Sequence, residues 1–340
     1  MKPIKIGNKT IGETFPVFII AEIGSNHDGK LEQAKKLIKA AADAGADAVK
    51  FQSFSAEGLL NPLRLENKKW VPHPAYPIIK KLEMPDEWHK PLFDYAQKCG
   101  VIFLSAAFDS RKANLLNKLD VPVFKIASGD LTDLPLIKLI SGFKKPMILS
   151  TGAAYLSEVK EAISIIKKVG NNNIILLQCA ALYPPKFSDS NIRAMVTLEK
   201  TFHLYVGYSD HTPGYAVPLG AVALGAKIIE KHITFSRKLK GPDHPYAMEI
   251  KEFKKMVDDI RNLEQALGSG KKEPARSEMP ERIGARKSLY ATKAIKKGST
   301  ITKEMIKTVR HAYGLPPKMI SSVVGKKAKH NIKKNELIRL

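Results

Sequence analysis

Ionisable and hydroxyl side chains recur directly after short apolar runs of this chain, where a catalytic site can be built. Glu22 ends one run, Lys50 and Gln52 lie in a second, and Lys125 with Ser128 lies in a third. Lysine offers a point charge to phosphate or carboxylate, while hydroxyls and backbone N–H groups fill the remaining acceptor sites. We therefore expect a pocket for a small phosphorylated anion. Further polar residues at such positions are Ser105, Asp109, Asp130, Ser150, Tyr183, Asp210, Glu230 and Lys231.

Two histidines, His211 and His232, lie at the ends of two later runs of the same kind. No short ligand motif joins them, but on neighbouring strands both imidazoles would reach one divalent metal. Two histidines with open coordination positions suit a Lewis-acid site for Mn²⁺, Zn²⁺ or Fe²⁺. Glu22 is then a candidate base or a partner of metal-bound water, and its alternative is an ion pair with Lys50. Schiff-base chemistry at Lys50 or Lys125, as in an aldolase, is a second reading of the lysines.

The formal net charge of +23 admits nucleic acid, an acidic membrane surface or an anionic substrate as partner. Residues 282–340 carry 16 Lys and Arg against 2 Asp and Glu, so 16 − 2 = +14 lies in this segment. The basic residues are scattered and few aromatics lie between them, which argues against single-strand binding. A lysine-rich solvated surface is therefore favoured over a nucleic-acid partner.

These polar groups end or follow eight apolar runs, and amphipathic segments such as 31–45 and 156–170 separate the runs. Near-continuous apolar strands that alternate with helices predict a parallel sheet covered on its outer face. Eight runs favour a closed (β/α)₈ TIM barrel over an open doubly wound α/β sheet, and the carboxyl ends of all strands would then face one mouth. The runs are 17–21, 47–51, 101–105, 122–128, 146–151, 173–179, 204–209 and 227–232.

The composition also predicts how the chain is divided and where it works. The barrel domain is expected over 1–267, ending in a helix over 249–267, followed by a Gly-, Pro- and charge-rich linker over 268–281 and a small domain over 282–340. No run approaches the roughly 20 apolar residues that cross a bilayer, so no membrane partner is expected. Two cysteines, without a disulfide framework, fit a reducing cytoplasm.

Seven ordered motifs and the C-terminal segment resemble the sialic acid synthase family, which includes N-acetylneuraminate synthase and its legionaminate and pseudaminate relatives. The resemblance spans nearly the whole chain, and 285–328 looks like the family's C-terminal antifreeze-like (β-clip, SAF) domain. The motifs are AEIGSNHDG (21–29), VKFQ (49–52), FKIASGD (124–130), LSTG (149–152), GYSDHTPG (207–214), IIEKHIT (228–234) and GPDH (241–244).

The resemblance implies an enzyme that condenses phosphoenolpyruvate with an open-chain N-acetylhexosamine, with C–O cleavage and release of phosphate. It implies that His211 and His232 bind a divalent metal, Mn²⁺ with Mg²⁺ and Co²⁺ as alternatives, that polarises the sugar aldehyde, and that Glu22 acts beside them. It also implies a domain-swapped homodimer in which Arg310 reaches the N-acetyl group of the sugar. By the same resemblance, Lys50, Lys125, Ser128 and Ser150 bind phosphoenolpyruvate, and Gln52, Asp130, Tyr183, Glu230 and Asp243 bind the sugar.

Three alanines, Ala106, Ala180 and Ala181, stand where relatives carry small polar residues or Pro, and each removes a potential hydrogen bond from the pocket. The GPDH motif resembles the sialic and legionaminic branches more than the pseudaminic one. The sugar is therefore expected to be N-acetylmannosamine, with a 2,4-diacetamido hexose as the alternative, and the sequence does not decide whether it is 6-phosphorylated. A non-enzymatic ice- or polyanion-binding role for the C-terminal domain is disfavoured by the full set of polar strand ends.

Overall fold

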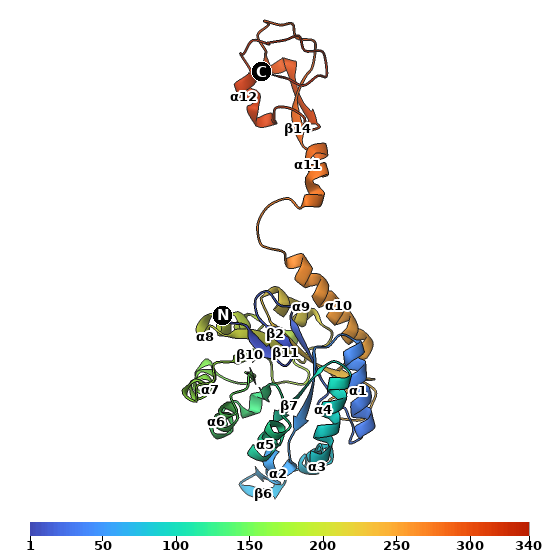
Figure 1. Ribbon diagram of the computed structural model, residues 1–340, viewed down its shortest axis with the longest axis vertical. Coiled ribbons are helices and arrows are strands. Elements are labelled where there is room, and N and C mark those ends of the chain that lie inside the picture. Colours follow the sequence, from blue (N-terminus) through green and yellow to red (C-terminus); the bar gives the residue numbers. More distant parts are fainter. Residues whose placement is uncertain (340) are drawn as a thin grey trace. The chain divides into compact units, whose positions relative to one another are not determined.

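Parallel strand pairing closes on itself in the computed structural model, which describes residues 1–339 (Figure 1). Within that range, eight parallel strands pair in a ring, with β12 joining β3 on one side and β11 on the other. This confirms the (β/α)₈ barrel. In ring order the strands are β3 (Phe18–Glu22), β4 (Ala48–Ser53), β7 (Ile102–Ala107), β8 (Phe124–Ile126), β9 (Met147–Ser150), β10 (Ile174–Gln178), β11 (Tyr205–Asp210) and β12 (Ile228–Thr234).

Helices surround the strands because each buries one stripe of apolar residues at helical spacing. In α1 (Leu31–Asp43), for example, Ala34, Leu37, Ile38 and Ala41 are buried. The other outer helices are α4 (His89–Lys98), α5 (Ser110–Lys118), α6 (Leu134–Gly142), α7 (Leu156–Lys168), α8 (Arg193–Phe202), α9 (Ala216–Ala223) and α10 (Ile250–Leu267).

Asp109, one of the polar residues considered for the barrel mouth, directly precedes α5. The Asp109 carboxylate accepts a hydrogen bond of 2.7 Å from the backbone N–H of Lys112. Asp109 is thus the N-cap of α5, where an acidic side chain satisfies a free backbone donor. This capping role accounts for an aspartate at position 109 without a role in a ligand pocket.

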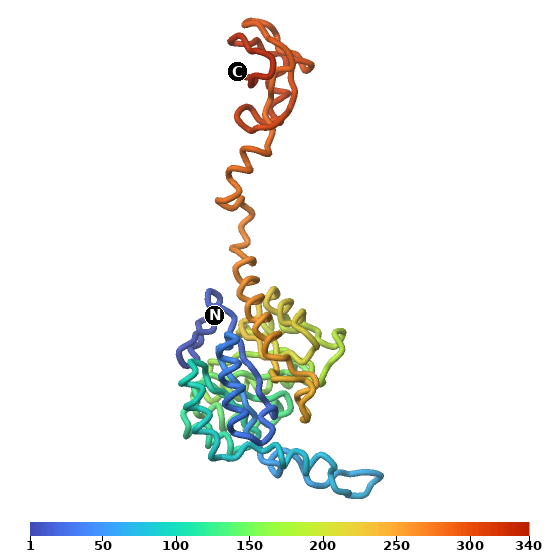
Figure 2. Tube along the Cα trace, turned by 90° about the vertical axis from the view of Figure 1, so that its right-hand side faces the viewer, coloured from blue at the N-terminus to red at the C-terminus, as the bar shows by residue number. Residues whose placement is uncertain are grey.

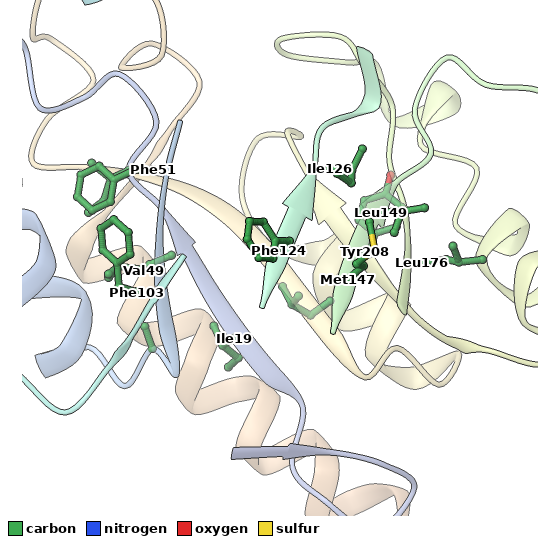
Figure 3. Packing of buried hydrophobic residues seen from close by; sticks show 14 of the residues in the cluster. Ile19, Val49, Phe51, Phe103, Phe124, Ile126, Met147, Leu149, Leu176 and Tyr208 are labelled. Atoms are coloured by element: carbon green, nitrogen blue, oxygen red, sulfur yellow. The ribbon is translucent and has the colours of Figure 1, made fainter. Parts of the chain in front are cut away.

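Two apolar layers follow from the alternation of side chains along each strand. Ile19, Val49, Phe51 and Phe103 point outward and pack between strands and helices (Figure 3). The intervening residues form an inner cluster with the N-terminal hairpin β1 (Ile4–Ile6) and β2 (Lys9–Ile11). The inner cluster includes residues that begin their strands, so apolar side chains fill the amino-terminal end of the barrel and leave polar groups to the carboxyl end.

The long connection after β4 forms an arm that extends from the barrel (Figure 2, light blue). It contains α2 (Ala56–Leu59), the antiparallel pair β5 (Leu63–Glu66) and β6 (Lys69–Pro72), and α3 (Tyr76–Leu82). Apolar side chains on the hairpin, including Leu65 and Trp70, are exposed.

The chain divides into two compact units, Met1–Gly268 and Ser269–Leu340. The second unit begins with a short 3₁₀ turn and α11 (Met279–Ala285), so the segment expected to be a linker contains helical turns. Its sheet pairs β14 (Lys287–Ala291) with β15 (Ile306–Arg310), and its own apolar core includes Leu289, Ile301 and Ile332. Within residues 1–339, no helix is long and apolar enough to cross a membrane.

Candidate active site

Strand periodicity selects the polar side chains that face the barrel interior. On β12, Ile228 belongs to the inner apolar cluster and Ile229 to the outer one. Successive side chains alternate between the two faces, so Glu230 and His232 point inward and Lys231 points toward the helices. The same period places Glu22 on β3 inward. It also places Lys50 and Gln52 on β4, Lys125 on β8 and Ser150 on β9 inside the barrel, near its carboxyl end.

Three polar residues at the predicted strand ends face away from the interior, which corrects the expectation that they line the mouth. Ser105 lies 2.6 Å from the Ser53 hydroxyl, which in turn lies 2.7 Å from His89 Nε2. Asp210 and Lys231 pair with each other at 2.5 Å behind the strands. All are buried and hydrogen-bonded, so their polarity serves the outer layer rather than a ligand pocket.

Two lysines and two carboxylates form the cationic half of the interior site. Lys50 Nζ lies 2.6 Å from Glu22 and 3.7 Å from Glu230, and Lys125 Nζ lies 3.6 Å from the same Glu230 oxygen. Lys125 also donates a hydrogen bond of 2.7 Å to the hydroxyl of Ser150. The ion pair of Glu22 with Lys50, expected as an alternative to a catalytic role, is therefore present. Glu230 lies beside the lysines expected to bind phosphoenolpyruvate. Gln52 completes the cluster by donating to Glu22 at 2.9 Å.

Burial and charge set the protonation of this cluster. Burial raises the pKa of Glu22 to about 7, against the pull of Lys50 and with help from Glu230. Burial would raise the pKa of Glu230 too, but the charges of Lys125 and Lys50 outweigh it and hold that pKa at about 2. Burial lowers the pKa of Lys125. The site therefore holds one firmly ionised carboxylate, and a second that exchanges its proton near neutral pH.

The raised pKa of Glu22 predicts a pH-dependent stability. Folding favours the protonated carboxyl of Glu22. The stability that this preference contributes is complete below pH 4.5, the ordinary pKa, and is lost as the pH rises through about 7. We expect the free energy of unfolding of wild type relative to Glu22→Gln to fall by about 3 kcal/mol over this range. Urea unfolding of both proteins at several pH values measures it, with the exposed Glu57→Gln as the control for a lost charge. A difference in free energy of unfolding between wild type and Glu22→Gln that does not change with pH would contradict the raised pKa of Glu22.

Beside the lysines, the ends of β8, β9 and β10 bring Ser128 close to a backbone donor. Its hydroxyl accepts from the N–H of Gly152 at 3.1 Å and lies 3.2 Å from the thiol of Cys179. Asp130 follows Ser128, and its buried Oδ2 has no hydrogen-bond partner among the described residues. Burial raises the pKa of Asp130 to about 7, with Asp133 adding to the shift and Lys125 opposing it. Asp130 thus offers an unused polar atom to a ligand.

The two histidines form the second half of the site. The ring centroids of His211 and His232 lie 5.3 Å apart, and the ring of Tyr183 lies 4.4 Å from that of His211. Burial lowers the pKa of His211 to about 3 and that of His232 to about 4, so both imidazoles are neutral at physiological pH and have a lone pair to donate. His211 Nδ1 lies 3.2 Å from the carbonyl of Ala180, whereas the buried Nδ1 of His232 has no partner among the described residues.

This pair fits a divalent metal that keeps open coordination positions. Neutral imidazoles are metal ligands, and the unpartnered Nδ1 of His232 costs free energy unless something binds it. Within residues 1–339, no group of three or more His, Cys, Asp or Glu side chains is arranged to hold a metal. A cation here would therefore take two protein ligands and leave room for substrate oxygen or water, as catalytic metals do.

Tyr246 and Ser25 border the histidines, although neither is among the predicted site residues. The Tyr246 ring lies 5.1 Å from His232, and its hydroxyl donates to Asp243 at 2.7 Å. The other oxygen of Asp243 accepts from the backbone N–H and the hydroxyl of Ser25, at 2.9 and 2.8 Å. Burial would raise the pKa of Asp243, but nearby His232 and these donors hold it below its usual value. Both segments are irregular, so strand periodicity could not assign them. The only signal was that Ser25 lies inside the motif AEIGSNHDG and that Tyr246 follows GPDH by two residues.

Gly24 lies where these groups come together, which predicts a large effect of a single methyl group. Its φ is +53°, and a Cβ there would lie 2.6 Å from Asp243 Oδ2 and 3.3 Å from His232 Cε1. We expect Gly24→Ala to lower the free energy of unfolding by about 1–3 kcal/mol and to displace Asp243. Gly100→Ala, with φ of +78° and no atom within 4 Å of the added Cβ, is the control for backbone strain alone. Urea unfolding measures both variants, and an equal loss of stability in the two would contradict a clash with Asp243.

The remaining predicted residue, Arg310, ends β15 in the second unit, where its side chain is exposed. Its role toward the sugar stays a prediction. The first unit alone brings together the other predicted site residues, from seven of the eight strand ends in residues 1–339 and from the segment after β12.

A parallel barrel with a polar carboxyl-end mouth defines the TIM-barrel enzymes, whose chemistry lies at that end. Comparison with known families is more specific, because residues 37–272 match the NeuB family and 286–340 match the SAF domain. The chain belongs to the NeuB family.

Named relatives span nearly the full chain. The N,N'-diacetyllegionaminic acid synthase of Campylobacter jejuni is 43% identical over 94% of this chain and 98% of its own. The pseudaminic acid synthase of the same species is 38% identical over 95% of each chain. A crystal structure of N-acetylneuraminic acid synthetase from Leptospira borgpetersenii, in complex with citrate, is 39% identical and superposes with a TM-score of 0.76, covering 82% of this chain and 95% of that one. The predicted family is thereby confirmed.

Proposed function

We propose that this protein is a nonulosonic acid synthase, which condenses phosphoenolpyruvate with an open-chain N-acetylhexosamine and releases phosphate. One observation carries the proposal: two buried lysines and two neutral, buried histidines gather at the carboxyl end of one barrel. Phosphoenolpyruvate carries a carboxylate and a phosphate, and both need cationic partners where water is excluded. Coulomb attraction between such charges is worth several kcal/mol in a partly desolvated site.

Each group of residues then has a distinct task. Lys50, Lys125, Ser128 and Ser150 hold the carboxylate and phosphate of phosphoenolpyruvate and fix the molecule in the barrel mouth. The same contacts orient C3 of phosphoenolpyruvate toward the sugar aldehyde, so that a carbon–carbon bond forms between them. Water adds at C2, and the bond between C2 and the phosphate oxygen then breaks as inorganic phosphate leaves.

His211 and His232 would hold a divalent metal, with Mn²⁺ the first candidate and Mg²⁺ or Co²⁺ as alternatives. When bound, the metal supplies Lewis-acid polarisation of the aldehyde. Glu22, whose pKa is raised to about 7, is suited to take a proton from the attacking water and to return one later. Its partner Lys50 lies 2.6 Å away and would be drawn toward phosphoenolpyruvate when that anion binds.

For the sugar, we propose N-acetylmannosamine or the 2,4-diacetamido hexose of the legionaminic branch. The higher identity to the legionaminic relative than to the pseudaminic one supports this choice, as does the GPDH motif. Gln52, Asp130, Tyr183, Glu230 and Asp243 would bind the sugar, and Arg310 would reach its N-acetyl group in a domain-swapped homodimer. Cys99 and Cys179 are both free thiols, which fits a protein that acts in the reducing cytoplasm.

A phosphate-release assay tests the proposal. Phosphoenolpyruvate and Mn²⁺ are offered with N-acetylmannosamine, with its 6-phosphate and with 2,4-diacetamido hexoses, and each product is identified by mass spectrometry. We expect chelator-sensitive phosphate release with one sugar of the panel. Turnover that a chelator leaves unchanged would refute the metal-assisted reaction, and no release with any sugar would refute the substrate class.

A Schiff-base aldolase is the competing function, and one observation favours it: burial lowers the pKa of Lys125, as an amine nucleophile requires. Such an enzyme would work without metal and would form an imine with the carbonyl substrate. Borohydride reduction followed by mass spectrometry would find a covalent adduct on Lys125 or Lys50. We expect none, because Lys125 is engaged with Ser150 and lies beside Glu230.

A further inference from the structure

The buried ion pair behind the histidines has no part in the reaction as proposed, yet it is adjacent to both of them in sequence. Asp210 is the last residue of β11 and directly precedes His211, and Lys231 precedes His232 on β12. The two strands pair in parallel with Asp210 directly opposite Lys231. Both residues are at most 2% exposed, so the pair is sealed in the layer between strands and helices.

Lys231 contacts the chain on both sides of His211. Its ammonium lies 2.5 Å from Asp210 Oδ2 and also donates to the backbone carbonyl of Thr212. Asp210 in turn accepts from the backbone N–H of Thr212 at 3.1 Å and from its hydroxyl at 2.9 Å. One ammonium group thus fixes the residues before and after His211, while its own backbone continues into His232.

We propose that Lys231 and Asp210 form a clamp that positions the two histidines for metal binding. A buried ion pair adds little to stability, because desolvation of the charges offsets much of their attraction. The clamp sets the direction in which the histidines point. Asp210 and Lys231 face outward, so the side chains that follow them, His211 and His232, must face inward. Metal affinity depends on such placement, because residues that orient the ligands affect binding about 10–100-fold. This inference rests on the proposed metal site.

The test removes the charges and keeps the shape. Asp210→Asn with Lys231→Met retains an acceptor for Thr212 and an apolar stem in place of the lysine. We expect the double variant to unfold at a urea concentration close to that of wild type, and to bind Mn²⁺ about 10–100-fold more weakly. Electron paramagnetic resonance of free Mn²⁺ gives the dissociation constant without turnover. Phosphate release should recover as Mn²⁺ is raised, because the ligands themselves remain.

A second buried lysine, paired with a partly exposed aspartate, provides the control. Lys112 Nζ lies 2.5 Å from Asp86 on the outside of the barrel, and neither residue is adjacent to a histidine of the site. Asp86→Asn with Lys112→Met should bind Mn²⁺ as wild type does. If the Asp210 and Lys231 double variant does not fold, Asp210→Glu keeps both charges but lengthens the carboxylate, and it should weaken Mn²⁺ binding as well.

The outcomes separate this inference from the proposed function. A folded double variant with wild-type affinity for Mn²⁺ would overturn the clamp and leave the metal site standing. Equal weakening in the control pair would also overturn it, because the loss would then follow from removal of any lysine–aspartate pair around the barrel. Wild-type protein that binds none of Mn²⁺, Mg²⁺ and Co²⁺ would overturn the metal site itself, and the clamp with it.

Discussion

Replacement of either histidine, His211→Ala or His232→Ala, is expected to abolish metal-dependent phosphate release. The two rings lie 5.3 Å apart, and they are the protein ligands proposed for the metal. Loss of one leaves a single imidazole, which cannot hold the cation at micromolar concentrations. The loss of turnover should exceed about a hundredfold, as removal of a principal electrostatic stabiliser of the transition state does. Phosphate release and Mn²⁺ binding are measured on the same preparations.

The fold should survive both substitutions. Each histidine lies at the barrel mouth, so alanine leaves a polar space that water can fill. Urea unfolding of each variant is the control, and His203→Ala, a substitution at the C-terminal end of α8, controls for the loss of an imidazole elsewhere. Full turnover in either site variant, with or without added metal, would refute the assignment of the pair.

Substitution of Lys125, one of the two buried lysines of the site, by methionine is expected to raise the KM for phosphoenolpyruvate far more than the KM for the sugar. Lys125 is 2% exposed and donates to Ser150, so it offers a desolvated positive charge to an anion. Truncation of one partner of such a buried charged contact costs about 2–5 kcal/mol. We therefore expect kcat/KM for phosphoenolpyruvate to fall by roughly thirtyfold or more.

Lys125→Arg separates charge from geometry. The guanidinium keeps the charge but is planar and branched, unlike the compact ammonium, so partial activity is expected. In both variants Glu230 retains the partner Lys50, which lies 3.7 Å away in the wild-type structure, and this limits the damage to the fold. If Lys125→Met raised the KM for the sugar alone, Lys125 would belong to the sugar side of the site.

Much of this molecule could be predicted from strand patterns. Eight apolar runs gave the barrel because strands buried on both faces are apolar nearly throughout, and the polar residues at their ends stood out against that background. The spacing of two residues between Lys50 and Gln52, or between Glu230 and His232, already implied that each pair shares a face. The motifs of the sialic acid synthases then specified a family, which the matches over residues 37–272 and 286–340 confirm.

Other features could be learned only from the tertiary structure, because they depend on which face of each strand points into the barrel. The sequence placed Lys231 and Ser105 among the mouth residues, yet both point into the outer layer. Periodicity gives the alternation but not its phase at a polar strand end, where either face tolerates a hydrogen-bonded residue.

The amino-acid sequence by itself determined the barrel, the family and the residue types of the site, since these follow from local patterns of burial and charge. Only the tertiary structure decided that Glu22 pairs with Lys50, that Glu230 lies between the two lysines, and that Tyr246 joins the histidines. Such contacts join segments up to 180 residues apart, Lys50 and Glu230 for example, and they arise from closure of the barrel. No local pattern records them, because their energy comes from groups that meet only when the eight strands of residues 1–339 form a ring.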